Sequence, residues 1–253
     1  MRIDLSNILL TGGSGTLGTQ IIKSKLFDNL LTPSKQVLDI TKLTSINNFF
    51  CSNEIDFVIH CAGLSKMAIC EDKPQDAIRT NIIGTANLVR SIIGIEQQQE
   101  RKIRFIHIST DGVYNSKKGN YSETSATIPY NNYGWSKLGA ECAVQLLSNY
   151  VIIRTRFFNS ENIPYDNSAN DVFTSSIPLN ELIEAIHFLL YSRFIGTINV
   201  GDVRMSEFDR YKKYKTSLKP CTRADIAKSL NFEIAKDASM NIDCWHELQI
   251  TKK

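Results

Sequence analysis

Short apolar runs alternate with segments of helical periodicity over the first two thirds of the chain. Near-continuous apolar side chains predict strands at residues 8–10, 57–59, 105–108 and 151–153. Between them, apolar residues recur every three or four positions near 17–26, 82–93 and 133–149, which predicts helices. Strands without polar alternation are buried on both faces, as in a parallel sheet covered by helices. The pattern therefore predicts a doubly wound α/β fold.

The pattern loosens after Arg154. Residues 161–176 are mostly polar, and a helix is predicted near 179–190 with a strand at 197–200. From Gly201 the chain is polar and basic, and we expect this tail to complete a small lobe over the open end of the sheet. We expect one domain over residues 1–155 and a smaller lobe over 156–253, with residues of about 179–200 packing back on the first domain.

Composition narrows the function classes. Of the 253 residues 42% are hydrophobic and 22% charged, and the net charge is +3 without a basic stripe, so nucleic acid is not an expected partner. Six cysteines without C-x-x-C spacing favour reduced thiols and a cytoplasmic location. Scattered histidines predict no metal site, and no apolar run predicts a signal peptide or a membrane span.

A glycine-rich turn follows the first strand. Gly12, Gly15 and Gly18 are spaced G-x-x-G-x-x-G, between a predicted strand and an amphipathic helix. Gly12 suits the tight turn, Gly15 suits close approach of a pyrophosphate to the helix N-terminus, and Gly18 suits close helix–strand packing. The intervening Ser14, Thr16 and Leu17 belong to the same turn. This arrangement predicts a Rossmann site for a nicotinamide dinucleotide.

The choice of nicotinamide stays open at this point. Asp39 lies about where an acid could bind the ribose 2′-hydroxyl, which would favour NAD. Ser34 and Lys35 could instead hold the 2′-phosphate of NADP, or form only an exposed turn.

A tyrosine and a lysine four residues apart form the candidate catalytic pair. Tyr133 and Lys137 lie one helical turn apart on one face of the predicted helix, where an ammonium favours the phenolate. The strand at 105–108 ends in Ser109 and Thr110, and ligand groups project from the carboxyl ends of such strands. Thr110 is the better candidate for binding a substrate carbonyl, and Ser109 the second.

Together these blocks resemble the extended short-chain dehydrogenase/reductase superfamily, and within it the dTDP-4-dehydrorhamnose reductase branch. The likeness covers roughly residues 6–160. It is carried by T-G-G-S-G-T-L-G, L-D-I-T at 38–41, H-I-S-T-D-G-V-Y at 107–114, Y-S-E at 121–123, P-Y-N-N at 129–132 and Y-G-W-S-K at 133–137.

The resemblance implies roles for particular residues. It makes Thr110, Tyr133 and Lys137 the catalytic triad and the three glycines the pyrophosphate loop. Asp39 and Ile40 would flank the adenine, which weakens the case for NAD. The remaining implied positions are Cys61, Ala62 and Gly63 along the cofactor, Asn81 in support of the catalytic helix, and Asp111, Arg156 and Asn159 on the substrate side.

The chain also departs from this branch. The stretch between Arg154 and the helix near Leu179 is shorter than usual, the usual substrate-domain motifs are missing after Phe173, and Gly112 replaces a bulky residue. The expected activity is NADPH-dependent reduction of a nucleotide-activated 4-keto-deoxysugar, with NAD as the possible alternative cofactor.

Two other interpretations remain. The first is a sugar-nucleotide epimerase or dehydratase, although dehydratases usually carry an Asp-Glu pair where this chain has Asp111-Gly112. The second is a non-catalytic NADP-binding subunit like the regulatory subunit of methionine adenosyltransferase. Related enzymes pair the catalytic helix with the preceding one, so we expect a homodimer. Leu138, Cys142, Leu146 and Leu147 suit either that interface or the core.

Overall fold

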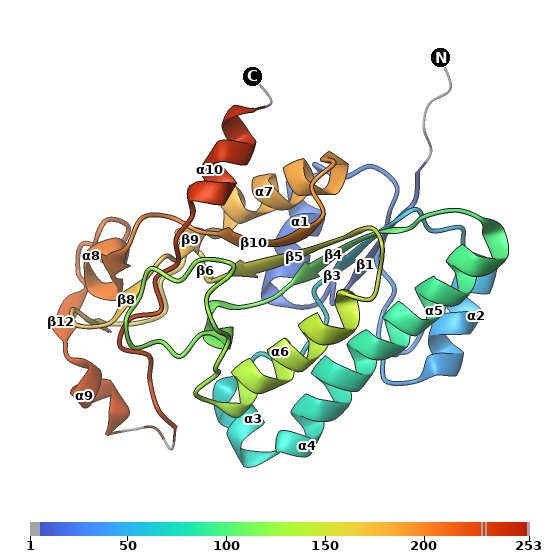
Figure 1. Cartoon of the computed structure of the whole chain (residues 1–253). Helices are drawn as coiled ribbons and strands as arrows, with labels where there is room; N and C mark the ends of the chain where they lie inside the picture. Colours follow the sequence, from blue (N-terminus) through green and yellow to red (C-terminus); the bar gives the residue numbers. More distant parts are fainter. Residues whose placement is uncertain (1–5, 229, 231, 252–253) are drawn as a thin grey trace.

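A six-stranded parallel sheet forms the centre of the computed structural model, which describes residues 6–228, 230 and 232–251 (Figure 1). The spatial order is β10-β5-β4-β3-β1-β2, and every neighbouring pair is parallel. The strands are β1 (Ile8–Thr11), β2 (Leu30–Leu31), β3 (Phe57–His60), β4 (Arg104–Ile108), β5 (Tyr150–Thr155) and β10 (Gly196–Val200). The predicted doubly wound α/β fold is confirmed, and β2 is a strand that the pattern did not predict.

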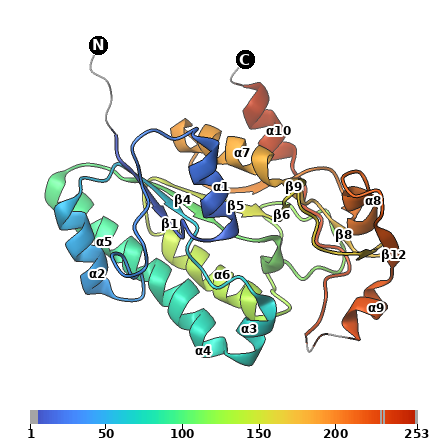
Figure 2. The same ribbon diagram turned by 180° about the vertical axis from the view of Figure 1, so that it is seen from behind.

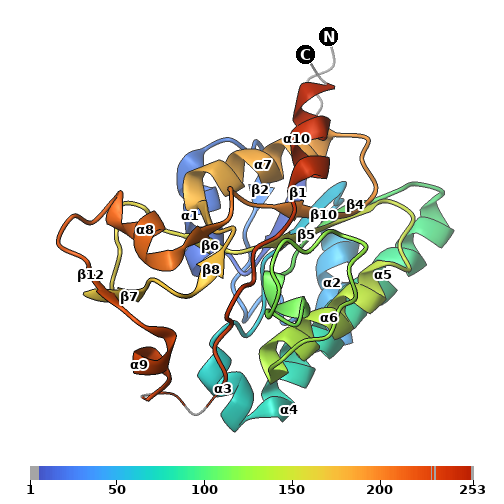
Figure 3. The same cartoon turned by 60° about the vertical axis from the view of Figure 1, so that its left-hand side comes forward.

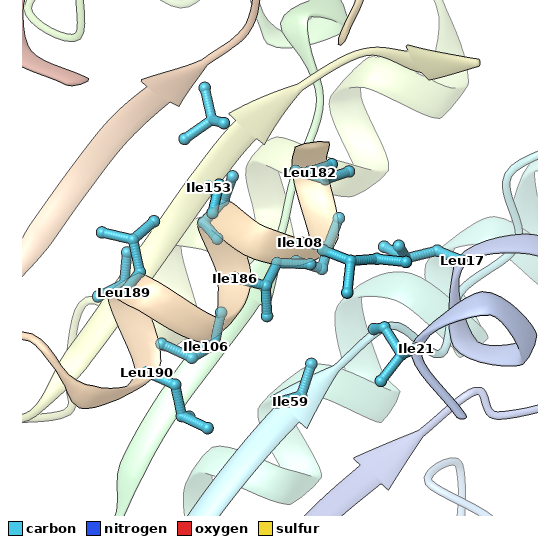
Figure 4. Close-up of a cluster of buried hydrophobic side chains, with 14 of the residues drawn as sticks. Leu17, Ile21, Ile59, Ile106, Ile108, Ile153, Leu182, Ile186, Leu189 and Leu190 are labelled. Carbon is cyan, nitrogen blue, oxygen red and sulfur yellow. The ribbon is translucent and has the colours of Figure 1, made fainter. Parts of the chain in front are cut away.

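Helices cover both faces of this sheet (Figures 1 and 2). One face carries α1 (Thr16–Ser24), α7 (Leu179–Tyr191) and α10 (Asp243–Ile250), and the other α2 (Leu43–Ser52), α5 (Gly84–Gln99) and α6 (Asn132–Val144). Side chains of β4 alternate between the two cores: Ile106 and Ile108 point toward α7 (Figure 4), whereas Phe105 lies in the opposite cluster. Two apolar layers explain why the strands read as continuous apolar runs.

The chain changes direction at β1. It leaves β1 through α1 to β2 on one side, then returns through α2 to β3 on the other side of β1. Such a switch point opens a crevice at the carboxyl ends of the strands. Register places Thr11 beside His60, and His60 beside His107, at this edge.

The helix leading to α5 contains a π-helical segment. After α3 (Met67–Asp72), the chain runs through α4 (Pro74–Ala77) into the π-helix η1 (Ile78–Ile83) and on into α5. Wide π-turns interrupt α-helices frequently at functional sites. Here the π-turn contains the buried Asn81, whose amide nitrogen donates to the Ser136 hydroxyl at 2.8 Å. The helix predicted near 82–93 is thus longer than its apolar spacing indicated.

A smaller lobe stands at the carboxyl edge of the sheet (Figure 3). Three two-stranded pairs build it, β6–β9, β7–β12 and β8–β11, around a core that contains Phe158, Tyr211 and Leu218. Its elements are β6 (Phe157–Phe158), β7 (Asn167–Ala169), β8 (Phe173–Thr174), β9 (Ile177–Pro178), β11 (Met205–Ser206), α8 (Glu207–Lys212), β12 (Lys219–Cys221) and α9 (Arg223–Ala227).

Two predictions about segments need correction. The tail after Gly201 does not lie wholly in the lobe, because Trp245 of α10 packs against Phe188 of α7 at 5.6 Å between ring centroids, in the core of the main sheet. Helix α6 ends at Val144 rather than near Asn149, and turns occupy the residues before β5. No helix among the described residues is long and apolar enough to cross a membrane.

Candidate functional site

The glycine turn has the tight geometry that its spacing indicated. Gly12 has φ +76°, and a Cβ there would lie 2.6 Å from the Ala62 nitrogen. A Cβ on Gly18 would meet the Gly12 carbonyl oxygen and lie 2.8 Å from Gly13 Cα. Gly15 is the N-cap of α1 and gives the helix no side-chain cap. The turn is therefore packed as closely as bare backbone permits, with free helix amides facing outward for an anion.

A cleft of about 500 Å³ opens at the switch point, between this turn and α6. It also reaches Met67 of α3 and Phe157 and Tyr165 of the lobe. Twelve of the predicted site residues line it: Gly12, Gly15, Thr16, Leu17, Gly18, Cys61, Gly63, Thr110, Asp111, Tyr133, Lys137 and Arg156. Residues as far apart in the sequence as Gly12 and Tyr165 thus meet in one cavity.

Tyr133 faces Thr110 because two backbones pack closely. Thr110 caps the 3-10 helix η2 (Asp111–Val113), where its hydroxyl accepts from the Gly112 amide at 3.1 Å. A Cβ on Gly134 would overlap the Gly112 carbonyl, so only glycine lets α6 come this near. Burial raises the pKa of Tyr133 to about 12, against the lowering effect of the Thr110 hydroxyl. The phenol therefore keeps its proton at neutral pH.

Lys137 also lines the cleft but is almost fully buried. Its side-chain nitrogen donates to the Ile108 carbonyl at 2.7 Å and lies 3.3 Å from His107 Nε2. The residue is 7% exposed, and burial lowers its pKa to about 8 although Glu141 raises it. The lysine is thus partly deprotonated just above neutral pH.

Three charged groups meet at the lobe side of the cleft. Arg156 Nε donates to Asp111 at 2.7 Å, and its terminal nitrogen lies 3.4 Å from Glu207 of α8. Burial lowers the pKa of Arg156, but Asp111 and Glu207 more than offset this and raise it well above its usual range. The arginine is charged and faces two carboxylates, one more than its own charge neutralises. Sequence reasoning missed Glu207, which lies 51 residues beyond Arg156 in a stretch without a motif.

Ser109, the second hydroxyl of the strand end, has a structural partner. Its hydroxyl donates to Glu141 at 2.5 Å, and Glu141 pairs with Arg154 at 2.7 Å, both buried. Arg154 also donates to the Tyr114 hydroxyl at 2.9 Å. This network ties α6 to β5. Ser109 and Thr110 both line the cleft, but the Ser109 hydroxyl is engaged with Glu141, and Thr110 is the one that hydrogen-bonds Tyr133.

Some predicted cofactor positions lie around the cleft rather than in its lining. Ser14 is exposed at the turn, Ala62 packs against Gly12, and Asn81 holds Leu64 through its amide. Ile40 is buried against Gly84 and does not line the cleft.

Residues 34–39 form the surface beyond the turn. Ser34 and Lys35 are exposed, and Lys35 and Asp39 border a separate hollow of about 600 Å³. The Asp39 carboxylate accepts from the Thr41 amide at 3.0 Å and from the Thr41 hydroxyl at 2.8 Å. Both bonds go to the same oxygen, Oδ1, so Asp39 has a local structural partner in Thr41.

Asn159 is not brought into the cleft. It lines a different hollow of about 510 Å³ between α1 and α7, and its side chain accepts from the Glu161 amide at 3.1 Å. The substrate-side position predicted from the Arg154–Asn159 segment therefore falls to Arg156 alone. Among the described residues, no group of three or more metal-ligating side chains gathers.

A parallel sheet with a glycine turn, and a Tyr-x-x-x-Lys helix on the same cleft, define a Rossmann-type protein with the site layout of short-chain dehydrogenases/reductases. Residues 6–174 match the family described as RmlD substrate binding domain, and the chain belongs to this family.

Three similar proteins illustrate its range. GDP-6-deoxy-D-talose 4-dehydrogenase of Aggregatibacter actinomycetemcomitans is 28% identical over 152 residues, which cover 58% of this chain and 49% of that protein. dTDP-glucose 4,6-dehydratase of Neisseria gonorrhoeae is 28% identical over 171 residues, 55% of this chain and 49% of that protein. The crystal structure of dTDP-4-dehydrorhamnose reductase from Bacillus anthracis in complex with NADP matches with a TM-score of 0.84 and 22% identity, covering 96% and 92% of the two chains.

The chain spans about half the length of the curated relatives it matches. The structural likeness extends over nearly the whole chain and, at this identity, defines the fold.

Proposed function

We propose that this chain is a reductase of a nucleotide-activated 4-keto-deoxysugar that uses NADPH. The single observation that carries the proposal is that Thr110, Tyr133 and Lys137 line one cleft with the pyrophosphate turn. A hydride acceptor carbonyl between Thr110 and Tyr133 would face the cofactor end of the same cavity.

The residues present fit a dinucleotide phosphate. Gly12, Gly15 and Gly18 leave room for a pyrophosphate against backbone amides at the N-terminus of α1. Ser34 and Lys35, which are exposed, would hold the 2′-phosphate of NADP. When bound, the reduced nicotinamide supplies the hydride.

The chain's own residues supply the proton and the orientation. Thr110 would orient the substrate carbonyl oxygen, and Tyr133 would give its proton to the oxygen as negative charge develops there. The raised pKa of Tyr133, about 12, keeps the acid protonated before reaction. The Lys137 ammonium would bind the nicotinamide ribose and stabilise the phenolate left behind, before solvent restores its proton.

The lobe side of the cleft would receive the sugar. Asp111 and Arg156 pair next to the catalytic hydroxyls, and Glu207 adds a second carboxylate to this side. A neutral sugar with several hydroxyls suits these donors and acceptors better than a sugar carboxylate, which would meet two carboxylates there.

Replacing Tyr133 with phenylalanine tests the proposal. Tyr133→Phe should bind NADPH normally and reduce sugar substrates at least about 100-fold more slowly, since a positioned acid contributes roughly 100- to 10,000-fold. NADPH oxidation would be followed with dTDP-, GDP- and UDP-linked 4-keto-deoxysugars, and Tyr150→Phe, on the far end of β5, is the matched control. Unchanged turnover in Tyr133→Phe would refute the mechanism. Purified protein that retains its cofactor and consumes no net NADPH would favour the epimerase or dehydratase. A partner protein that co-purifies, without turnover of any sugar nucleotide, would favour the regulatory subunit.

We further propose a cytoplasmic homodimer, built on the face formed by η1, α5 and α6. Large apolar side chains are exposed there, with Ile78, Ile83, Trp135 and Leu146 each at least 46% accessible. Helices α5 and α6 lie side by side in Figures 1 and 3, so a second copy would bury these side chains together. Sedimentation of the purified chain distinguishes a dimer from a monomer.

A further inference from the structure

A buried imidazole lies directly beneath the catalytic lysine. His107 belongs to β4, has no exposed surface, and its Nε2 lies 3.3 Å from the Lys137 nitrogen. Because side chains alternate along a strand, His107 points to the same face as Phe105, the face that α6 covers. The Lys137 nitrogen therefore has two acceptors on adjacent residues. One is the Ile108 carbonyl at 2.7 Å, and the other is the His107 ring.

A second imidazole lies beside the first but has other partners. His60 of β3 pairs in register with His107, and their ring centroids are 5.3 Å apart. Its Nδ1 and Nε2 contact the hydroxyls of Thr11 and Thr85 at 2.7 and 2.9 Å. Of the two histidines, only His107 has a hydrogen bond to Lys137 among the described contacts.

The lysine determines the form of the His107 ring. An ammonium donates and cannot accept, so Nε2 must offer a lone pair and the ring proton must sit on Nδ1. His107 Nδ1 has no hydrogen-bond partner among the described residues, which a purely structural histidine would rarely tolerate. A protonated ring would place a second positive charge 3.3 Å from the ammonium, inside the protein.

We propose that His107 is a positioning residue. Its neutral imidazole, together with the Ile108 carbonyl, holds the Lys137 side chain in its place in the lining of the cleft. The ammonium has three protons. If two of them bond His107 and the Ile108 carbonyl, one remains for the ligand side of the cavity. The inference rests on the proposed reductase function for its role in catalysis, whereas the anchoring itself is a property of the ligand-free chain.

Loss of the imidazole should change when Lys137 loses its proton. An acceptor stabilises the ammonium, so its removal favours the neutral amine and moves deprotonation to lower pH. The other influences on Lys137 stay the same in this variant. They are its burial, Glu141 on its own helix, His60 at the end of β3, and Cys61 directly after that strand. A hydrogen bond to a charged group corresponds to a shift of about one to two pH units.

Trace labelling with acetic anhydride measures this directly. The pH dependence of Lys137 acetylation, read by peptide mass spectrometry on the ligand-free chain, gives the midpoint of its deprotonation. His107→Leu removes the acceptor, and His107→Gln keeps an amide oxygen as an acceptor. His60→Leu removes an equally buried ring whose two nitrogens bond Thr11 and Thr85 and not Lys137. Circular dichroism checks folding, and His107→Met replaces His107→Leu if the latter does not fold.

The expected result is a midpoint about one to two pH units lower in His107→Leu, with His107→Gln and His60→Leu close to wild type. The alkaline limb of kcat/KM for sugar reduction should shift in parallel. An unchanged midpoint in the folded apolar variant, or an equal shift in His107→Gln, overturns the proposal. If the wild type reduces no sugar nucleotide, the reductase proposal fails, while the labelling of ligand-free protein still decides the role of His107.

Discussion

The buried pair between Glu141 and Arg154 offers the sharpest test of what holds α6, and with it Tyr133 and Lys137, against the sheet. The two side chains are 0% and 6% exposed, and their oxygen and nitrogen lie 2.7 Å apart. Glu141 also accepts a hydrogen bond from the Ser109 hydroxyl, and Arg154 also donates one to the Tyr114 hydroxyl. Glu141→Leu would leave a guanidinium buried without its carboxylate.

The cost of that change follows from the burial. Removing one partner of a buried ion pair destabilises a protein by about 3–5 kcal/mol, because the remaining charge has lost its compensation. For a chain of this size each kcal/mol lowers Tm by about 2–4 °C, so Glu141→Leu should melt roughly 6–20 °C below wild type.

The double variant Glu141→Leu/Arg154→Met separates charge from packing. It removes both charges and should recover more than half of the loss, leaving about 1–2 kcal/mol for the Ser109 hydroxyl, which loses Glu141. The Tyr114 hydroxyl keeps its bonds to Asn199 and to the Ser122 carbonyl. Urea unfolding followed by circular dichroism of wild type, Glu141→Leu, Arg154→Met and the double variant gives four free energies of unfolding, and from them the coupling of the pair. A loss below about 1 kcal/mol in Glu141→Leu, or a double variant as unstable as the sum of the single variants, would refute the reasoning.

Two further predictions concern the glycine turn and pH. Gly18→Ala should abolish NADPH binding in a fluorescence titration, because its Cβ would overlap the backbone of Gly12 and Gly13. The control Gly94→Ala, whose Cβ would meet no atom within 4 Å, should raise the free energy of unfolding by about 0.5–1 kcal/mol. NADPH binding by Gly18→Ala would contradict the close packing. Lys137 has a folded pKa of about 8, against ~10.4 unfolded, so the unfolded chain binds more protons between these values and stability should rise with pH there. Lys137→Met should remove this rise, about 3 kcal/mol in urea unfolding, and an identical pH dependence in both proteins would count against the buried ammonium.

The sequence alone was sufficient where the determinants are local. The apolar runs of β1, β3, β4 and β5 predicted a parallel sheet because strands buried on both faces need apolar side chains at every position. The turn from Gly12 to Gly18 and the four-residue spacing of Tyr133 and Lys137 are also local, since backbone geometry and helical periodicity decide which groups share a face.

The sequence was not sufficient where partners come from distant segments. Glu207 pairs with Arg156 because the fold of the lobe brings the start of α8 next to it, and no pattern around Glu207 indicates this. The exclusion of Asn159 from the cleft, and the return of Trp245 to the main core, likewise depend on how the chain turns after β5.

His107 illustrates the boundary between the two. Its place in a strand follows from the apolar residues around it, and its face follows from strand alternation. That its Nε2 meets the Lys137 ammonium depends on the packing of α6 on β4, which a close approach at Gly134 permits. The sequence thus determined the fold class and the chemical groups, and the tertiary structure decided which of those groups touch, because hydrogen bonds and ion pairs act only over a few ångströms.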